Sequence, residues 1–255
     1  MQEKIHKYLN RINRIIKFRK TLSSLKKGNL KIIYCFAHQI YDWFREVEYL
    51  LFYLLCRPIP LKNKVVASAF NGKKYGDNTK YIVEKMHELN PEIEIVWLKD
   101  SDSDYKTPEY VRNVICSSDK YIFRRVYEYA TAKVWLDTHL YDKYLIKRKG
   151  QLVINTWHGG LGIKKIEGDC RNLVIDRNWE YLAKKNADLT DFWISNSDFE
   201  TRIYKRAFWN VKNIKEYGHP RNDIFFTKYD RIIKKVKKEL GISFESKMVL
   251  YVPTF

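Results

Sequence analysis

This sequence of 255 residues lacks the common signatures of metal, nucleotide and redox sites. Its four cysteines stand far apart without a C-x-x-C pair, which favours reduced thiols over a zinc site or a disulfide framework. There is no G-x-G-x-x-G fingerprint, no P-loop and no G-x-S-x-G elbow. Asp100, Asp102 and Asp104 lie in a polar connector that is more typical of a solvated loop than of a cation site. The sequence therefore predicts no metal.

Long hydrophobic runs are also lacking. The longest uncharged apolar stretch, residues 49–56, is far too short to span a bilayer. The amino terminus has no apolar run followed by a small-residue cleavage site, as a secretory signal would. These absences favour a protein that is soluble or attached to a membrane surface.

Acidic residues are outnumbered by basic ones. The chain has 48 Lys and Arg against 30 Asp and Glu, a formal net charge of +18. Such an excess implies an anionic partner, which would be a nucleic acid, a lipid surface or a phosphate-rich substrate. Nucleic-acid motifs are missing, and the basic residues gather at the amino terminus and not among aromatic stacking positions. Nucleic acid is therefore the least favoured of the three partners.

The first 61 residues are expected to be helical. Residues 1–31 carry ten Lys and Arg against the single acid Glu3, with apolar residues at helical spacing. This basic amphipathic pattern is typical of a helix on an anionic membrane, and a solvated helix packed on the domain explains it equally well. Residues 32–60 are aromatic and apolar, which suits either an interfacial face or a buried helix. Pro58 and Pro60 mark the start of the main domain.

From residue 62 onward, short β-branched runs alternate with helical stretches. This alternation predicts βαβ units and a parallel sheet, an α/β fold. Strands are predicted at residues 65–70, 93–98, 113–116, 134–136, 152–155, 192–195, 214–217 and 248–252. Helices are predicted at residues 79–89, 121–131, 198–208 and 229–240. We divide the chain into an amphipathic segment (1–61), a Rossmann-like domain (62–227), and a linker helix with the first strand of a second domain (228–255).

Ligands of such sheets bind at the carboxyl ends of the strands, so the loops that follow strands carry the candidate site. The run 152–155 leads directly into Trp157 and His158, then into Gly159, Gly160 and the pair Lys164 and Lys165. Glycines allow close approach of a ligand to backbone N–H groups, and lysines suit phosphate. His158, placed at an open mouth of the sheet, can take a proton from an attacking hydroxyl. A structural histidine is the plainer alternative.

Two further loops supply candidates. Gly218-His219-Pro220-Arg221-Asn222-Asp223 follows a strand, and its arginine suits phosphate or carboxylate. For Asp223, the favoured interpretation is that it braces a domain junction. For Arg221, bracing and phosphate binding are equally good interpretations. Pro220 fixes the turn and is counted with the junction. Asn71 and Gly72 belong to a Gly-rich basic loop that suits an anion at a helix start. For Asp77 or Asn78 in the same loop, a helix cap is an equally good interpretation, and Asn196-Ser197-Asp198 farther on is interpreted first as a cap for the next helix.

These loops, in this order, resemble the CDP-glycerol glycerophosphotransferase family of teichoic-acid and capsule synthesis. The family pattern is similar to Trp157-His158-Gly159-Gly160 with the lysine pair, Ile194-Ser195-Asn196-Ser197, Gly218-x-Pro220-Arg221-x-Asp223, Tyr251-x-Pro253-Thr254, and the Phe70-Asn71-Gly72 loop with Asp77-Asn78. The resemblance runs from about residue 65 to the last residue. Any one motif is modest, but four in the same order are specific.

The resemblance implies a GT-B architecture, with two Rossmann-like domains across a cleft. The first would handle a lipid-linked polymer acceptor and the second would bind CDP-glycerol, with no other cofactor. His158 would deprotonate the acceptor hydroxyl, and the protein would work peripherally on the cytoplasmic face of the membrane. The family's second catalytic histidine and its nucleotide-binding residues lie beyond the Pro-Thr strand, where this chain stops. We therefore expect little or no transferase activity from this polypeptide alone.

Other hypotheses stay open at this point. A membrane-bound remnant that binds acceptor without catalysis would keep the same basic amino terminus. Another GT-B sugar transferase, or a nucleotide-sugar epimerase, would need donor specificity that only the other half determines. The sequence also leaves open whether the chain forms homo-oligomers.

Overall fold

The computed structural model describes most of the chain from residue 31 onward. The described residues are 31–115, 121–139, 141–142, 144–160, 164–170, 177–209, 211–227 and 229–251. The basic amphipathic helix predicted within residues 1–31 falls almost wholly outside them.

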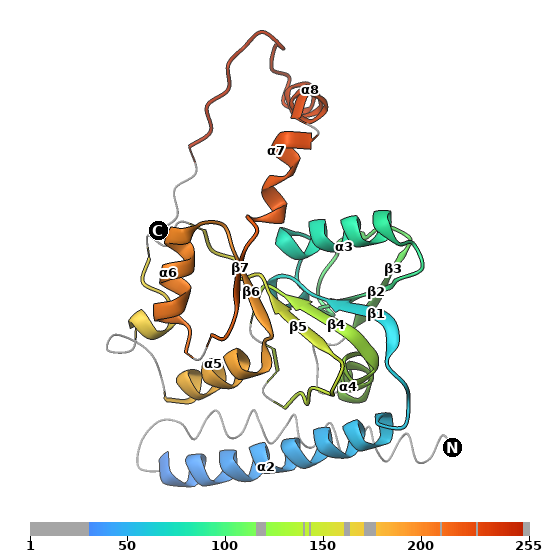
Figure 1. Cartoon of the computed structure of the whole chain (residues 1–255), viewed down its shortest axis with the longest axis vertical. Helices are drawn as coiled ribbons and strands as arrows, with labels where there is room; N and C mark the ends of the chain where they lie inside the picture. The colour runs from blue at the N-terminus through green and yellow to red at the C-terminus, as the bar shows by residue number, and fades with distance from the viewer. Residues whose placement is uncertain are drawn as a thin grey trace.

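A parallel sheet forms the centre of the fold (Figure 1). Its seven described strands lie in the order β3-β2-β1-β4-β5-β6-β7, and every pairing is parallel. The strands are β1 (Lys62–Ala67), β2 (Glu94–Lys99), β3 (Val111–Ile115), β4 (Ala132–Asp137), β5 (Leu152–Asn155), β6 (Phe192–Ser195) and β7 (Ile214–Glu216). The α/β fold and seven of the eight predicted strands are thereby confirmed.

Apolar side chains on both faces of the central strands hold the sheet between helical layers. Successive residues of a strand point to opposite faces, so Val65 and Val66 enter two different cores. The core on the side of Val65 includes Trp97 of β2 and Val83 of helix α3 (Asp77–Leu89). The core on the side of Val66 includes Trp135 and residues of α4 (Ile122–Thr131). Burial on both faces explains why these strands are continuous apolar runs.

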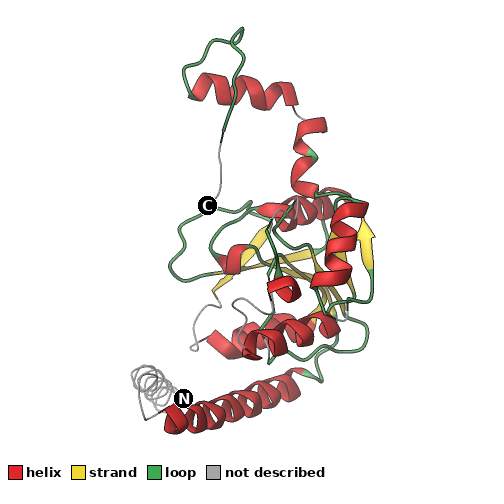
Figure 2. Cartoon of the chain, turned by 90° about the vertical axis from the view of Figure 1, so that its left-hand side faces the viewer, coloured by secondary structure: helices red, strands yellow, loops and turns green. Residues whose placement is uncertain are grey.

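Helix α2 (Lys31–Cys56) forms an extra layer beneath α4 (Figures 1 and 2). Tyr49 of α2 is 1% exposed, and its hydroxyl lies 2.5 Å from the carboxylate of Asp142. Phe52 packs edge-on against Phe123 of α4. The helix predicted in the aromatic stretch is therefore confirmed, and one of its sides is buried.

Helices α5 (Arg177–Leu189) and α6 (Asp198–Ala207) lie next to the half of the sheet that contains β6 and β7. Ser197 caps α6 as predicted, because its hydroxyl accepts a hydrogen bond from the N–H of Glu200. The short α7 (Ile224–Thr227) and α8 (Tyr229–Glu239) project away from the sheet (Figure 2). Helix α5 had no counterpart in the sequence prediction.

The strand predicted at residues 248–252 is wrong for residues 248–251, which have no regular structure. A strand needs a neighbour to accept and donate its backbone hydrogen bonds, and no described strand pairs with this segment. Its side chains are correspondingly open, with Val249 93% exposed. Residue 252 lies outside the described part of the chain. The proposed boundaries at residues 62 and 228 stay a prediction.

A buried ion pair lies within the fold, between β1 and α4. The Lys64 ammonium is 2.7 Å from Glu128 and 2.6 Å from the Thr131 hydroxyl, and the Lys64 side chain is fully buried. Arg112 also donates to both carboxylate oxygens of Glu128. These bonds satisfy charges that burial would otherwise make costly.

We predict that Lys64→Met destabilises the protein by about 3 kcal/mol, because the buried Glu128 loses one of its two cationic partners. Urea unfolding measures the change. The matched control is Lys85→Met, which removes an exposed pair with Glu88 and should cost about 0.5 kcal/mol or less. Equal losses for the two variants would contradict a structural role of the buried pair.

Candidate active site

The candidate site lies at the edge of the sheet where the strands end. Strand β1 lies between β2 and β4. After β1 the chain forms β2 and β3 on one side of it, and from β4 onward it forms the remaining strands on the other side. At such a switch point the loops separate and leave a crevice, where α/β proteins bind ligands. Thr138 and Thr156 follow β4 and β5 directly at this edge, and the residues after them form the site.

His158 is exposed at this edge, as the sequence analysis required. Its ring Nδ1 lies 2.9 Å from the carbonyl oxygen of Thr138. A carbonyl can only accept a hydrogen bond, so Nδ1 carries the proton in the neutral ring. The lone pair is then on Nε2, and this tautomer is the one that a general base requires at that atom. The geometry therefore prepares His158 to accept a proton through Nε2.

The sequence analysis missed a second histidine beside the first. The rings of His139 and His158 stack with centroids 4.3 Å apart and planes inclined by 10°. Burial and, to a smaller extent, the neighbouring His158 lower the pKa of His139 to about 4 against the opposing charge of Asp77, so His139 is neutral near pH 7. His139 follows β4 by two residues, so the rule that loops after strands carry ligands applies to it, but its contact with His158 depends on the pairing of β4 with β5.

Several residues around this edge have a left-handed backbone. Positive φ occurs at Phe70 (51°), Asn71 (55°), Asp77 (59°) and Trp157 (52°). For a residue other than glycine such a conformation costs on the order of 1 kcal/mol or more, and it tends to occur at functional sites. At Trp157 the turn buries the indole against Phe208 while the next residue, His158, is exposed.

Arg221 joins three loops. Its Nη1 lies 2.5 Å from Oδ1 of Asp77, and its Nη2 donates to the carbonyl of Gly159 at 3.0 Å. Nη1 also lies 3.3 Å from the carbonyl of His158. These contacts support bracing, one of the two roles that the sequence left open for Arg221. Its phosphate contact stays a prediction.

A buried polar chain lies behind Arg221. Asn78 accepts a hydrogen bond from the Arg221 N–H at 3.3 Å, and its Nδ2 lies 3.3 Å from Nδ1 of His219. Nε2 of His219 in turn faces a Glu200 carboxylate oxygen at 3.4 Å. His219 and Glu200 are 4% and 1% exposed, so this chain fixes the loop from inside.

The expectation that Asp77 or Asn78 caps helix α3 is wrong. The cap position belongs to Gly76, and no side chain accepts a hydrogen bond there. Asp77 and Asn78 instead turn toward Arg221 and His219. Asp77 pairs with the cation Arg221 while its Oδ1 also accepts the N–H of Asn78 at 2.7 Å, and the amide of Asn78 is held by Arg221 and His219.

The remaining predicted residues have mixed positions. Gly159 must be glycine, since a Cβ there would lie 2.9 Å from Nε1 of Trp157. The N–H of Gly72 donates to Ala69, and a Cβ would lie 2.8 Å from the backbone of Asp100, so Gly72 serves close packing. The other residues lie as follows: Asn71, Lys164 and Lys165 are exposed, Gly160 is half-buried beside Arg221, Pro220 begins the 3-10 turn η4 (Pro220–Asn222), and Asp223 ends it. Ligand contacts of all these residues stay predictions.

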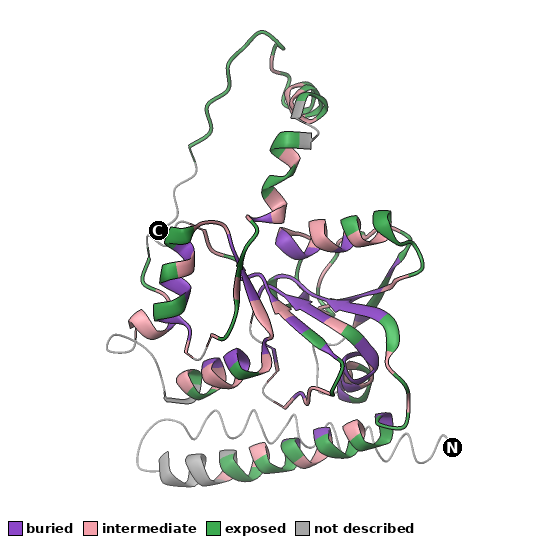
Figure 3. Cartoon of the chain, viewed as in Figure 1, coloured by how far each residue is buried: buried purple, intermediate pink, exposed green. Residues whose placement is uncertain are grey.

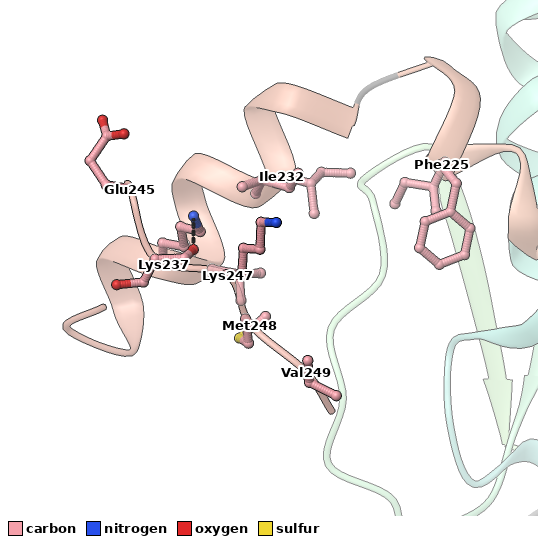
Figure 4. Close-up of a pocket in the computed structure, with 11 residues that line it drawn as sticks. Phe225, Ile232, Lys237, Glu245, Lys247, Met248 and Val249 are labelled. Carbon is pink, nitrogen blue, oxygen red and sulfur yellow. Dashed lines mark hydrogen bonds between the residues drawn. The ribbon is translucent and has the colours of Figure 1, made fainter. Parts of the chain in front are cut away.

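A hollow of about 640 Å³ lies away from His139 and His158, between α7, α8 and the segment before residue 250 (Figure 4). Aliphatic and aromatic side chains dominate its lining, among them Phe225, Ile232 and Met248. Lys237 is turned to the carbonyls of Phe244 and Ser246 and closes the loop after α8. This hollow therefore offers mainly apolar surface.

Among the described residues, no three His, Cys, Asp or Glu side chains gather as a metal site would require. No helix of the described part is long and apolar enough to cross a bilayer.

Comparison with known proteins shows the family of the chain. The family described as CDP-Glycerol:Poly(glycerophosphate) glycerophosphotransferase matches residues 50–255. The chain belongs to this family. It is similar to the teichoic acid poly(glycerol phosphate) polymerase of Staphylococcus epidermidis, 28% identical over 75% of this chain and 27% of that protein. The teichoic acid glycerol-phosphate transferase of Staphylococcus aureus is 27% identical over 86% of this chain and 54% of that protein.

A solved structure of the wall teichoic acid polymerase TagF, soaked with CDPG, matches the fold of this glycerophosphotransferase-family chain. The TM-score is 0.70 with 23% identity, and the match covers 86% of this chain and 56% of TagF. The α/β, GT-B-like fold implied by the resemblance is therefore confirmed. The chain spans between about a quarter and half of the length of its curated relatives.

We predict that Asp137→Asn alters the pH dependence of stability. Burial raises the pKa of Asp137 to about 7, against hydrogen bonds from His139, Thr138 and Ser68 that lower it. Between about pH 4 and pH 7 the unfolded chain has lost this proton while the folded chain keeps it. The free energy of unfolding should therefore fall as pH rises through that window, by up to about 4 kcal/mol, and Asp137→Asn should remove this fall.

Urea unfolding at several pH values measures the difference between the two proteins. His139 has the opposite effect, because its lowered pKa reduces stability as pH falls from about 6.5 to 4, but it is present in both and cancels. The exposed Asp102→Asn is the matched control and should leave the pH profile unchanged. Parallel profiles for wild type and Asp137→Asn would contradict the raised pKa.

Proposed function

We propose that this chain is the acceptor-side part of a glycerophosphotransferase that uses CDP-glycerol as donor. The proposal depends on one observation, the 2.9 Å contact between Nδ1 of His158 and the Thr138 carbonyl, which leaves Nε2 as the basic atom. The base stands exposed at the sheet edge, where both a donor and an acceptor can reach it. No cofactor other than the donor substrate is needed for this chemistry.

In the proposed reaction, Nε2 of His158 takes the proton of the terminal hydroxyl of a membrane-linked polymer. The hydroxyl oxygen forms a bond to the β-phosphorus of CDP-glycerol. The bond from that phosphorus to the bridging oxygen breaks, and CMP leaves with the electron pair. His158 becomes an imidazolium, and the neutral ring of His139 stacked on it at 4.3 Å supports the new charge. Catalysis of this kind depends on positioning and charge stabilisation.

We also propose that the protein works at the cytoplasmic face of the membrane, attached through its amino-terminal region. Helix α2 supports this proposal because it exposes a stripe of apolar residues opposite the buried Tyr49. Figure 3 shows that much of this helix is exposed. The stripe consists of Ile40, Trp43, Phe44, Leu50, Leu51, Leu54 and Leu55, which recur at intervals of three and four. Tryptophan and aliphatic side chains of this kind insert at the boundary between headgroups and acyl chains.

We predict that His158→Ala lowers transfer of glycerol phosphate by a factor on the order of 10²–10⁴, the worth of a well-placed base. Release of CMP from CDP-glycerol, with a lipid-linked acceptor present, measures the rate in the full protein that contains this segment. The matched control is His87→Ala, which removes a ring stacked on Tyr110 and should leave the rate unchanged. Unimpaired transfer by a folded His158→Ala protein would reject the catalytic role and favour a binding module.

We predict that the triple change Trp43→Ser, Leu51→Ser and Leu55→Ser weakens binding to vesicles containing anionic lipid at least tenfold. Each side chain is more than half exposed, and inserting it in the bilayer is worth about 1.5–3 kcal/mol. Sedimentation with the vesicles measures the bound fraction. Changing Leu89 and Phe199, which are exposed on other helices, to serine serves as the control. Equal binding by both variants would show that the α2 stripe does not contact the membrane.

A further inference from the structure

A polar cavity lies at the same edge of the sheet as the two stacked histidines and is used by none of the steps above. Its volume is about 390 Å³, and it opens where β1, β2 and β4 end. Ser68, Lys99 and Asp137 line it from the strand ends, Asn71 from the following turn, and Arg125 and Asp142 from α4 and the loop after β4. A volume in this range accommodates a small ligand.

The charges around the cavity balance one another. Arg125 lies 3.1 Å from Asp142, and Lys99 donates to the carbonyl of Tyr105 at 3.0 Å. Asp100 adds a second carboxylate to the lining. Two cationic groups therefore face at least two anionic ones, and a polyanion such as a phosphate chain finds no excess of positive charge here.

The polar groups instead suit hydroxyls. Asp137 accepts the N–H groups of Thr138 and His139 on Oδ1, at 2.6 and 3.0 Å, and a further hydrogen bond from the Ser68 side chain, which leaves about one of the four lone-pair sites of the carboxylate for a ligand. Asn71 presents both an amide donor and a carbonyl acceptor, and it is exposed. A hydroxyl both donates and accepts, so a ligand with several hydroxyls can pair with such a mixed lining.

The cavity and the candidate base share two loops. Asp137 directly precedes Thr138, whose carbonyl contacts His158. Asn71 directly follows Phe70, whose ring centroid lies 6.1 Å from that of His139. The segments that line the cavity therefore continue directly into residues that contact the stacked histidines.

We propose that this cavity binds the polyol end of the acceptor, a glycerol unit whose hydroxyls pair with Asn71, Ser68 and Asp137. The inference rests on the proposed function only in that this function supplies a polyol acceptor. The cavity orients the chain end, and His158 then acts on the hydroxyl that emerges from it.

The test is a titration of the isotope-labelled chain with glycerophosphoglycerol, followed by amide NMR shifts. We expect saturable shifts centred on residues 68–72, 98–100 and 137–142, which surround the cavity. Inorganic phosphate at the same concentration should not reproduce them. Shifts centred elsewhere, no saturation, or equal shifts with phosphate alone would overturn the assignment.

Asn71→Gly is the decisive variant, because glycine adopts the left-handed backbone at φ 55° without strain while the amide is lost. We expect its dissociation constant for glycerophosphoglycerol to rise about three- to tenfold. The matched control Asn90→Gly removes an exposed asparagine at the end of α3 and should bind as the wild type does. Equal affinity of the two variants would overturn the proposal.

His158→Ala separates this inference from the proposed function. The cavity does not include His158, so this variant should bind glycerophosphoglycerol with unchanged affinity. Binding that persists while transfer is lost supports both ideas. If transfer depends on His158 but no ligand binds in the cavity, the inference about the cavity is wrong and the catalytic role stands. If the ligand binds but transfer does not depend on His158, the catalytic role is wrong and the inference about the cavity stands.

Discussion

The hydrogen bond from His158 to the Thr138 carbonyl is the contact on which the candidate chemistry depends. It decides which ring nitrogen is basic, and it can form only because β4 and β5 are neighbours whose ends meet at one edge of the sheet. Thr138 leaves β4 and His158 leaves β5 within three residues of the strand ends. The order of the strands in the sheet thereby decides which tautomer of the His158 ring is present.

The surroundings of this hydrogen bond combine strain with bracing. The left-handed turn at Trp157 places an indole in the core and an imidazole outside within two consecutive residues. Such a turn holds only if neighbouring contacts fix it, and Arg221 provides them by binding the carbonyls of His158 and Gly159 together with Asp77. Strained backbone and an arginine fork therefore belong to one local arrangement.

The sequence predicted most of the sheet because its strands are buried on both faces and appear as continuous apolar runs. It also located His158, since a strand followed by His and glycines is a local pattern. It failed where partners from distant segments decide the outcome. The side chains of Asp77 and Asn78 contact Arg221 and His219, which lie more than 140 residues away in the sequence, and the cap position of their helix belongs to Gly76. His139 was overlooked because only the pairing of β4 with β5 brings it onto His158.

Arg221 also stands where the chain leaves the sheet, in the turn immediately before α7 and α8. Its guanidinium binds the carbonyls of His158 and Gly159, and its backbone N–H donates to Asn78, so the turn before the projecting helices is tied to the loop that carries the candidate base. A displacement of this turn would therefore also change the position of the His158 loop.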